Sequence, residues 1–131
     1  MMYRILLFLL LYNILFSQKG WIKTYGADEE DGSNHVLLLD DGYLITGFTK
    51  SFGNGDNDLW IIRTDINRKE LWNRFYGGMS METGYEAIQT KDDGFIILAQ
   101  TYSFGAGSSD IWIVKIDSAG NKLWDKTYGS E

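Results

Sequence analysis

The chain repeats itself with a period of 52 residues, and this feature limits what it can fold into. The segment SFGNGDNDLWIIRTD at 51–65 returns as SFGAGSSDIWIVKID at 103–117. Between 41–77 and 93–129, 16 of 37 aligned positions are identical. Because a fixed internal period marks a repeated supersecondary unit, we expect two copies of one small structure.

One short element of the repeat occurs three times. WIKTYG at 21–26 precedes WNRFYG at 72–77 by 51 residues, and WDKTYG follows at 124–129. We place the missing residue in the variable loop after the glycine. The chain therefore carries a leading copy of the last element of the unit, followed by two complete units.

Each unit is predicted to form four short strands. The Asp-Asp-Gly at 40–42 and 92–94 predicts a tight hairpin in which glycine accepts a positive φ. Gly120 supplies a left-handed turn residue before the last strand of the second unit. In the first unit Asn67 or Arg68 must bear that conformation, or the turn differs. The strands are expected near 34–39, 43–49, 58–65 and 70–77, and near 85–91, 95–101, 110–117 and 122–129, with His35 aligned with Ala87.

The strands predict sheets that are covered on both faces. LWIIRT at 59–64 and IWIVKI at 111–116 carry large apolar side chains on both sides. Four-stranded antiparallel units of about 50 residues with two buried faces are typical of β-propeller blades. We therefore predict an all-β fold of propeller-type blades, with a leading outer strand at 20–26, one blade at about 33–77 and a second at about 84–129.

Two blades cannot close a ring, since propellers have roughly four to eight. The sequence therefore favours the N-terminal fragment of a larger propeller. Assembly of several short chains into one ring is an alternative, and an open two-blade monomer is another. In each case an apolar sheet face would need a partner, so further repeats or self-association are expected.

The first 17 residues predict a secretory signal peptide. Arg4 precedes an apolar run from Ile5 to Phe16, which as a helix would rise only about 18 Å against the ~30 Å of a bilayer core. Ser17 is a small residue at which cleavage would leave 18–131 as the mature chain. An uncleaved membrane anchor is the alternative. The expected location is secreted or cell-surface, without membrane insertion after cleavage.

Composition excludes several classes of function. Removing 1–17 takes away Arg4 alone, which leaves 11 basic and 18 acidic residues, a net charge of −7. Such a surface repels nucleic acid and anionic lipid. The chain has no cysteine and a single histidine, His35. Thiolate metal sites and a multi-histidine zinc site are therefore excluded, and His35 is expected to be a hydrogen-bonded structural residue.

The repeat resembles that of secreted bacterial and archaeal β-propeller-like proteins. The resemblance lies in W-x-K-T-Y-G, D-G-[YF]-[LI]-I and S-F-G-x-G-x-x-D-[LI]-W-I-[IV]-[RK]-x-D, and it covers about residues 20–129. It implies a large surface or extracellular protein, often one exported by type IX secretion through a C-terminal sorting domain. This chain departs from that pattern in having few repeats and no sorting domain.

The loop at 51–58 has two interpretations. Asp56 and Asp58 offer the oxygen ligands that calcium prefers, with Asp110 in the second copy. The copies share Ser51, both glycines and the final aspartate, however, and Asp56 is replaced by serine. Shared glycines with an aspartate favour a structural turn in which the carboxylate accepts local backbone N–H groups. No cofactor is predicted, and calcium stays open as the alternative.

Several side chains are candidates for binding at one rim of the blades. The loop that contains Asp28-Glu29-Glu30-Asp31 and the loop at 51–58 should open on the same end. They would gather acidic groups there for a cation or a basic partner, and a solvated acidic loop is the plainer alternative. Tyr43 and Tyr102 are candidate exposed aromatics. The rim candidates are Asp28, Glu29, Glu30, Asp31, Asp56, Glu82, Tyr43 and Tyr102.

Three functions compete on this sequence. The first is a secreted, non-enzymatic binding or structural module that contacts an unknown protein or glycan. The second is a lectin-like propeller that binds carbohydrate through exposed aromatics. The third is part of a propeller enzyme whose catalytic residues lie outside this chain, since two blades with one histidine cannot supply a complete site.

Overall fold

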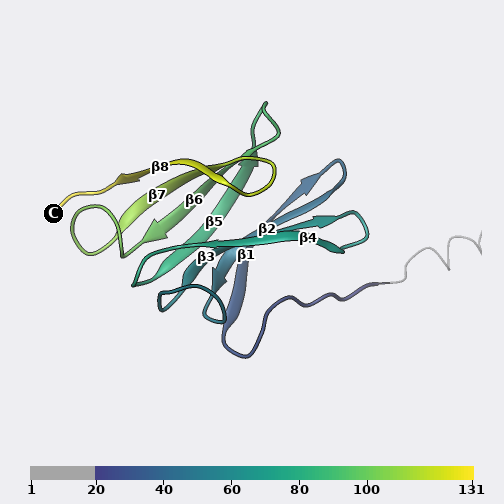
Figure 1. The fold of residues 1–131 in the computed structure, drawn as a ribbon, viewed down its shortest axis with the longest axis horizontal. Coiled ribbons are helices and arrows are strands. Elements are labelled where there is room, and N and C mark those ends of the chain that lie inside the picture. Colours follow the sequence, from purple (N-terminus) through teal and green to yellow (C-terminus); the bar gives the residue numbers. More distant parts are fainter. Residues whose placement is uncertain (1–19) are drawn as a thin grey trace, which may run out of the picture.

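A computed structural model describes residues 20–131, and the predicted signal peptide at 1–17 lies outside them. Within 20–131 the chain is all-β, with eight strands and no helix. Each unit contributes four strands, as the sequence predicted (Figure 1). They are β1 (Asp31–Leu39), β2 (Gly42–Thr49), β3 (Asp58–Asp65) and β4 (Glu70–Tyr76), then β5 (Glu82–Gln89), β6 (Phe95–Thr101), β7 (Asp110–Ile116) and β8 (Lys122–Tyr128).

Each unit forms its own antiparallel sheet. The strand orders are β1-β2-β3-β4 and β5-β6-β7-β8, and neither sheet closes on itself. Both first strands carry a bulge at the same place, between Ser33 and His35 in β1 and between Gly84 and Glu86 in β5. The duplicated sequence thus yields a duplicated sheet, down to its irregularities.

The extra residue of the second unit lies in the first hairpin, which corrects the predicted alignment. Leu39 pairs with Gly42 across a two-residue loop, whereas Thr90 N donates to Gly94 O across a three-residue loop. The first strands are therefore offset by 51 residues, so His35 is equivalent to Glu86 and not to Ala87.

The turn residues follow the backbone conformation that each loop length requires. Arg68 adopts a φ of 66°, equivalent to the 81° of Gly120, as one predicted alternative required. In the second hairpin the left-handed residue is Asp93, with a φ of 61°, and not the glycine. Three-residue hairpin loops place a left-handed residue at their third position. Gly94 is needed because a Cβ atom there would lie 2.4 Å from Ile116 O.

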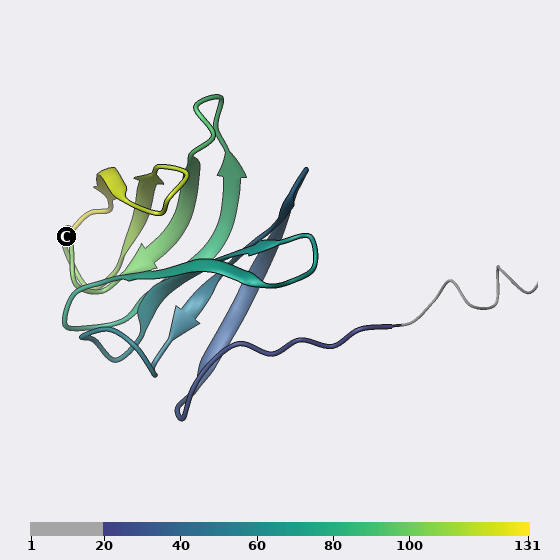
Figure 2. The ribbon, with the colours of Figure 1, turned by 45° about the vertical axis from the view of Figure 1, so that its right-hand side comes forward.

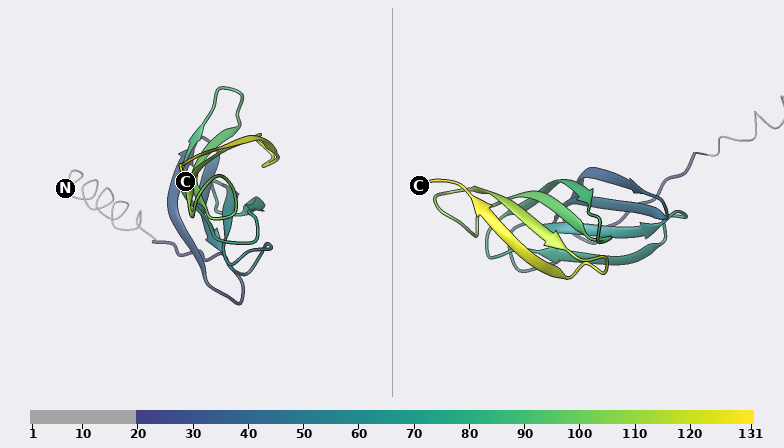
Figure 3. Two further views of the ribbon diagram at one scale, coloured as in Figure 1. Left: turned by 90° about the vertical axis from the view of Figure 1, so that its left-hand side faces the viewer. Right: turned by 90° about the horizontal axis from the view of Figure 1, so that it is seen from above.

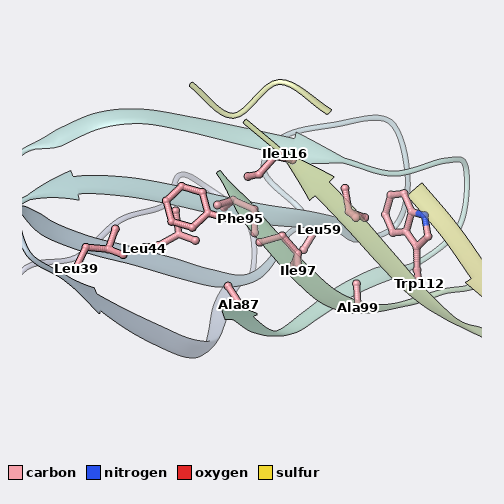
Figure 4. Packing of buried hydrophobic residues seen from close by; sticks show 11 residues of the cluster. Leu39, Leu44, Leu59, Ala87, Phe95, Ile97, Ala99, Trp112 and Ile116 are labelled. Carbon is pink, nitrogen blue, oxygen red and sulfur yellow. The ribbon is translucent and has the colours of Figure 1, made fainter. Parts of the chain in front are cut away.

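The two sheets stack face to face around the hydrophobic core (Figures 1 and 2). We call the face of each sheet that carries Leu44 or its equivalent Ile96 the front, and the other face the back. The front of the first sheet packs on the back of the second (Figure 4). The core comprises Leu39, Leu44, Leu59 and Ile61 from the first sheet, and Ala87, Phe95, Ile97, Ala99, Trp112, Val114 and Ile116 from the second.

The segment 20–26 is extended but is not a strand, contrary to the predicted leading outer strand. A strand needs a hydrogen-bonded neighbour. Strand β4 has β3 and strand β8 has β7, but segment 20–26 pairs with no strand of the described chain. The segment lies on the back of the first sheet instead. Tyr25 OH donates to Arg68 O at 2.6 Å, just as Tyr76 OH donates to Gly120 O.

We expect replacement of Tyr76 by phenylalanine to lower the free energy of unfolding by about 1–2 kcal/mol, because the buried Gly120 carbonyl loses its donor. Burial also raises the pKa of Tyr76, so the phenol stays a donor at neutral pH. Urea unfolding followed by tryptophan fluorescence measures the change. Tyr128→Phe is the matched control, since this equivalent tyrosine is exposed on β8. Equal losses in both variants would contradict the inter-sheet role of Tyr76.

Candidate functional site

The loop between β2 and β3 is a turn organised by Asp58. Asn54 N donates to Asp58 Oδ2 at 2.7 Å, and Gly53 adopts a φ of 104°. In the second unit Gly105 repeats that conformation with a φ of 94°. These features are those expected of a structural turn, and Asp56 is an exposed residue of it.

A carboxylate at the start of each sheet fastens this turn to the loop before the sheet. Thr49 Oγ1 donates to Asp31 Oδ1 at 2.5 Å, and Ser51 Oγ donates to Asp31 Oδ2 at 2.7 Å. In the second unit Thr101 Oγ1 donates to Glu82 Oε1 at 2.8 Å. The T-x-S of the repeat is thus a set of donors for one acidic side chain.

The roles of Asp31 and Glu82 in the turns were missed in the sequence, although a signal for them exists. Each lies five residues after the glycine of the Tyr-Gly pair, that is after Gly26 and Gly77. Glu82, one of the predicted rim residues, is fully buried. The reason is its hydrogen bonding, since Gly78 N and Ser103 N also donate to this carboxylate.

Asp58 and Glu82 face each other where the two sheets meet. A Cβ atom placed on Gly77 would lie 2.0 Å from Asp58 Oδ1 and 2.5 Å from Glu82 Oε2. Asp58 Oδ2 therefore accepts a hydrogen bond from its own turn, while Oδ1 lies beside Gly77 on the side of Glu82. Both side chains are buried, with exposed fractions of 2% for Asp58 and 0% for Glu82.

Two acidic side chains of the first unit, Asp58 and Asp31, differ in the direction of their pKa shifts. Burial raises the pKa of Asp58, hydrogen bonds from Asn54 N and Gly55 N lower it, and the charge of Glu82 raises it further, with a net increase. For Asp31, burial also raises the pKa, but the hydrogen bonds from Thr49, Ala27 N and Ser51 outweigh it and hold the pKa at about 2. Asp31 is therefore a stable anion, whereas the anion of Asp58 is disfavoured.

The acidic loop before β1 does lie beside the loop between β2 and β3, at the same end of the sheet. Glu29 N donates to Ser51 Oγ at 3.1 Å, and Glu30 pairs with Lys50 at 2.6 Å. Asp28 is exposed there as well. Because both partners of the ion pair are largely exposed, it contributes little to stability. Asp31 belongs to this loop in sequence but turns its carboxylate inward.

The two candidate tyrosines lie at opposite ends of the sheets. Tyr102 is exposed after β6, near the loops just described. Tyr43 is paired with Thr64 at the hairpin end, 6.4 Å from Trp21 between ring centroids. The structure therefore does not gather them into one aromatic platform. His35 accepts a hydrogen bond from Ala87 N of β5 at 3.3 Å, which is a structural role between the sheets.

A groove of about 390 Å³ opens on the back of the first sheet, beneath segment 20–26. Its floor is made of seven residues that are equivalent, one for one, to the seven core residues of the second sheet. Its wall carries Trp21, Lys23 and Tyr25, the equivalents of Trp72, Arg74 and Tyr76. The floor residues are Val36, Tyr43, Ile45, Gly47, Trp60, Ile62 and Thr64.

Within residues 20–131, no group of three or more histidine or acidic side chains is placed to hold a metal ion. The same part of the chain has no helix that is long and apolar enough to cross a membrane. No protein-family model matches the chain, and no curated protein matches it either.

Proposed function

We propose that this chain is a non-enzymatic structural and binding module of a secreted or cell-surface scaffold, built from propeller-type blades that stack on further blades of the same kind. The proposal agrees with the resemblance of its repeat to secreted propeller-like proteins. The observation that carries it is the open front face of the second sheet. The equivalent front face of the first sheet is covered by the second sheet.

The contact between the two sheets is head-to-tail, because it joins a front face to a back face. Leu59 on the front of the first sheet has no exposed surface beneath the second sheet. Ile111, its equivalent on the front of the second sheet, is 53% exposed. The front of the second sheet therefore presents an apolar surface like the front of the first sheet, which packs on the back of the second sheet.

The front of the second sheet carries other large apolar side chains in the open. Ile88 and Leu98 are exposed on β5 and β6, as are Trp124 and Tyr128 on β8. Strand β8 and strand β1 lie on opposite sides of the described part of the chain, so within residues 20–131 the first sheet does not cover this face (Figure 3). Exposed apolar surface of this kind marks an interaction site.

The back of the first sheet has the complementary design. Its groove repeats the residues that form the covered back of the second sheet, and segment 20–26 lies across it as β4 lies against the second sheet. A front face and a back face that differ but fit each other make a heterologous contact. Such contacts propagate into a ring or into a longer row.

We expect the purified chain to self-associate as its concentration rises, with an increasing weight-average mass in sedimentation velocity. Ile111→Asp should prevent this from the front face. Val36→Asp should prevent it from the back face, because the equivalent Ala87 is buried between the sheets. An aspartate at either position would have to be buried without a partner.

Ile66→Asp is the matched control, since Ile66 is an exposed apolar residue in the turn between β3 and β4. This variant should associate like the wild type. Far-UV circular dichroism establishes that all variants are folded. A wild-type chain that remains monomeric to millimolar concentration would overturn the proposal, and so would equal loss of association in the Ile66→Asp control.

A further inference from the structure

The carboxylates of Asp58 and Glu82 approach each other across Gly77 at the junction of the two sheets. The position that a Cβ atom on Gly77 would occupy lies 2.0 Å from Asp58 Oδ1 and 2.5 Å from Glu82 Oε2. A Cβ atom there would force both carboxylates to move. Two negative groups from different units are therefore held close together.

Asp58 Oδ1 has no hydrogen-bond partner although the side chain is interior. Asp58 is 2% exposed, and its other oxygen is satisfied by Asn54 N. No lysine or arginine of residues 20–131 forms an ion pair with Asp58 or with Glu82. A buried carboxylate oxygen without a donor, facing a second carboxylate, carries a large desolvation and repulsion cost.

Two backbone oxygens lie around a second point near Asp58 Oδ1, beside Gly55. A Cβ atom on Gly55 would lie 2.3 Å from Ser80 O, 2.9 Å from Gly78 O and 3.2 Å from Asp58 Oδ1. Asp58 Oδ1 is thus close to both points, one of which lies beside the Glu82 carboxylate and the other beside the two carbonyl oxygens. Gly77 itself is exposed, so a small ion can reach this cluster from solvent.

We propose that a calcium ion binds at this junction, held by Asp58 Oδ1 and Glu82 Oε2 with the carbonyl oxygens of Gly78 and Ser80 and with water. All of the candidate donors are oxygens, which calcium prefers, and calcium accepts mixed carboxylate and carbonyl ligands in irregular geometry. Two carboxylates would neutralise the two charges of the ion. The ion would join the turn of one unit to the loop that begins the next.

The repeat supplies an internal control for this proposal. Asp110 is equivalent to Asp58, and its Oδ1 is also buried without a partner. A Cβ atom on Gly129 would meet that oxygen at 1.3 Å, but no second carboxylate faces it within the described chain. The Asp58–Glu82 site lies wholly inside one chain, so it does not depend on the proposed stacking between chains.

The test is the effect of calcium on thermal unfolding of the full chain at pH 7, after removal of divalent ions with EDTA. The protein concentration is kept where sedimentation shows a monomer. We expect 10 mM CaCl₂ to raise the Tm by roughly 5–10 °C, if the affinity is in the range of roughly 10⁻⁴–10⁻³ M found for extracellular modules. Asp58→Asn and Glu82→Gln should each abolish the shift.

Two further variants and one condition keep the result interpretable. Asp110→Asn and Asp56→Asn should keep the full calcium shift, because neither removes a ligand. Without calcium, Asp58→Asn should melt no lower than the wild type, because it removes an uncompensated buried charge and leaves an amide that donates to Glu82. The proposal is overturned if calcium leaves the wild-type Tm unchanged, or if Asp58→Asn shows the wild-type shift.

Discussion

Replacement of Ile97 by alanine is expected to lower the free energy of unfolding by about 2–5 kcal/mol. Ile97 is on β6, at the centre of the back face of the second sheet, and has no exposed surface. Its neighbours come from both sheets, so the deletion opens a cavity that neither sheet can close alone. Urea unfolding monitored by tryptophan fluorescence, to which the buried Trp112 contributes, measures the loss.

Ile45→Ala is the matched control for this change. Ile45 occupies the same position in the first unit, but it lines the open groove and is only partly buried. Because solvent already reaches this site, the alanine variant should lose less than about 1 kcal/mol in the monomer. Similar losses at Ile45 and Ile97 would mean that the stacking of the two sheets does not provide the core.

The second, third and fourth strands of each unit were predictable because their sequence patterns occur in both copies of the repeat. The third strand, at 58–65, has the predicted bounds, and the second strands differ by at most one residue. The turn at Arg68 was also predictable, since Gly120 in the other copy shows which position needs a left-handed residue. Aligned copies therefore reveal conformational demands that one copy hides.

The register of the first strands was not predictable in the same way. DGSNHVLLL of β1 and ETGYEAIQ of β5 share almost no identical residues. The one-residue difference between the two units was therefore assigned to the variable loop before these strands and not to the hairpin after them. A hairpin can absorb one residue at low cost by changing its turn type, as Asp93 shows. The pattern of identities cannot detect such a change.

The carboxylate pair was hidden for a different reason. Asp31 and Glu82 differ in side-chain length, and Glu82 begins β5 after a loop that lacks charge. Their shared role depends on donors that arrive from the Thr-x-Ser motif some twenty residues later. The proximity of Asp58 to Glu82 depends on the stacking of two sheets, which the strand pattern does not specify.

Replacement of Glu82 by alanine should lower the free energy of unfolding by about 3–5 kcal/mol. The change removes a fully buried acceptor from Thr101 Oγ1, Ser103 N and Gly78 N at once. A donor left unsatisfied in the interior costs about 1–3 kcal/mol. Ser103 N keeps Thr101 Oγ1 as a second acceptor, and relief of the repulsion with Asp58 offsets part of the remaining cost, so the expected loss is less than three full penalties.

Asp31→Ala is the matched variant, because Asp31 accepts hydrogen bonds from the equivalent Thr49 and Ser51 in the first unit. Asp31 is only partly buried, so water can replace the carboxylate, and we expect a loss of about 1 kcal/mol. Both values come from urea unfolding at pH 7 in EDTA, so that no calcium contributes. A Glu82→Ala variant as stable as Asp31→Ala would show that the hydrogen bonds of the buried Glu82 contribute no more to stability than those of the partly exposed Asp31.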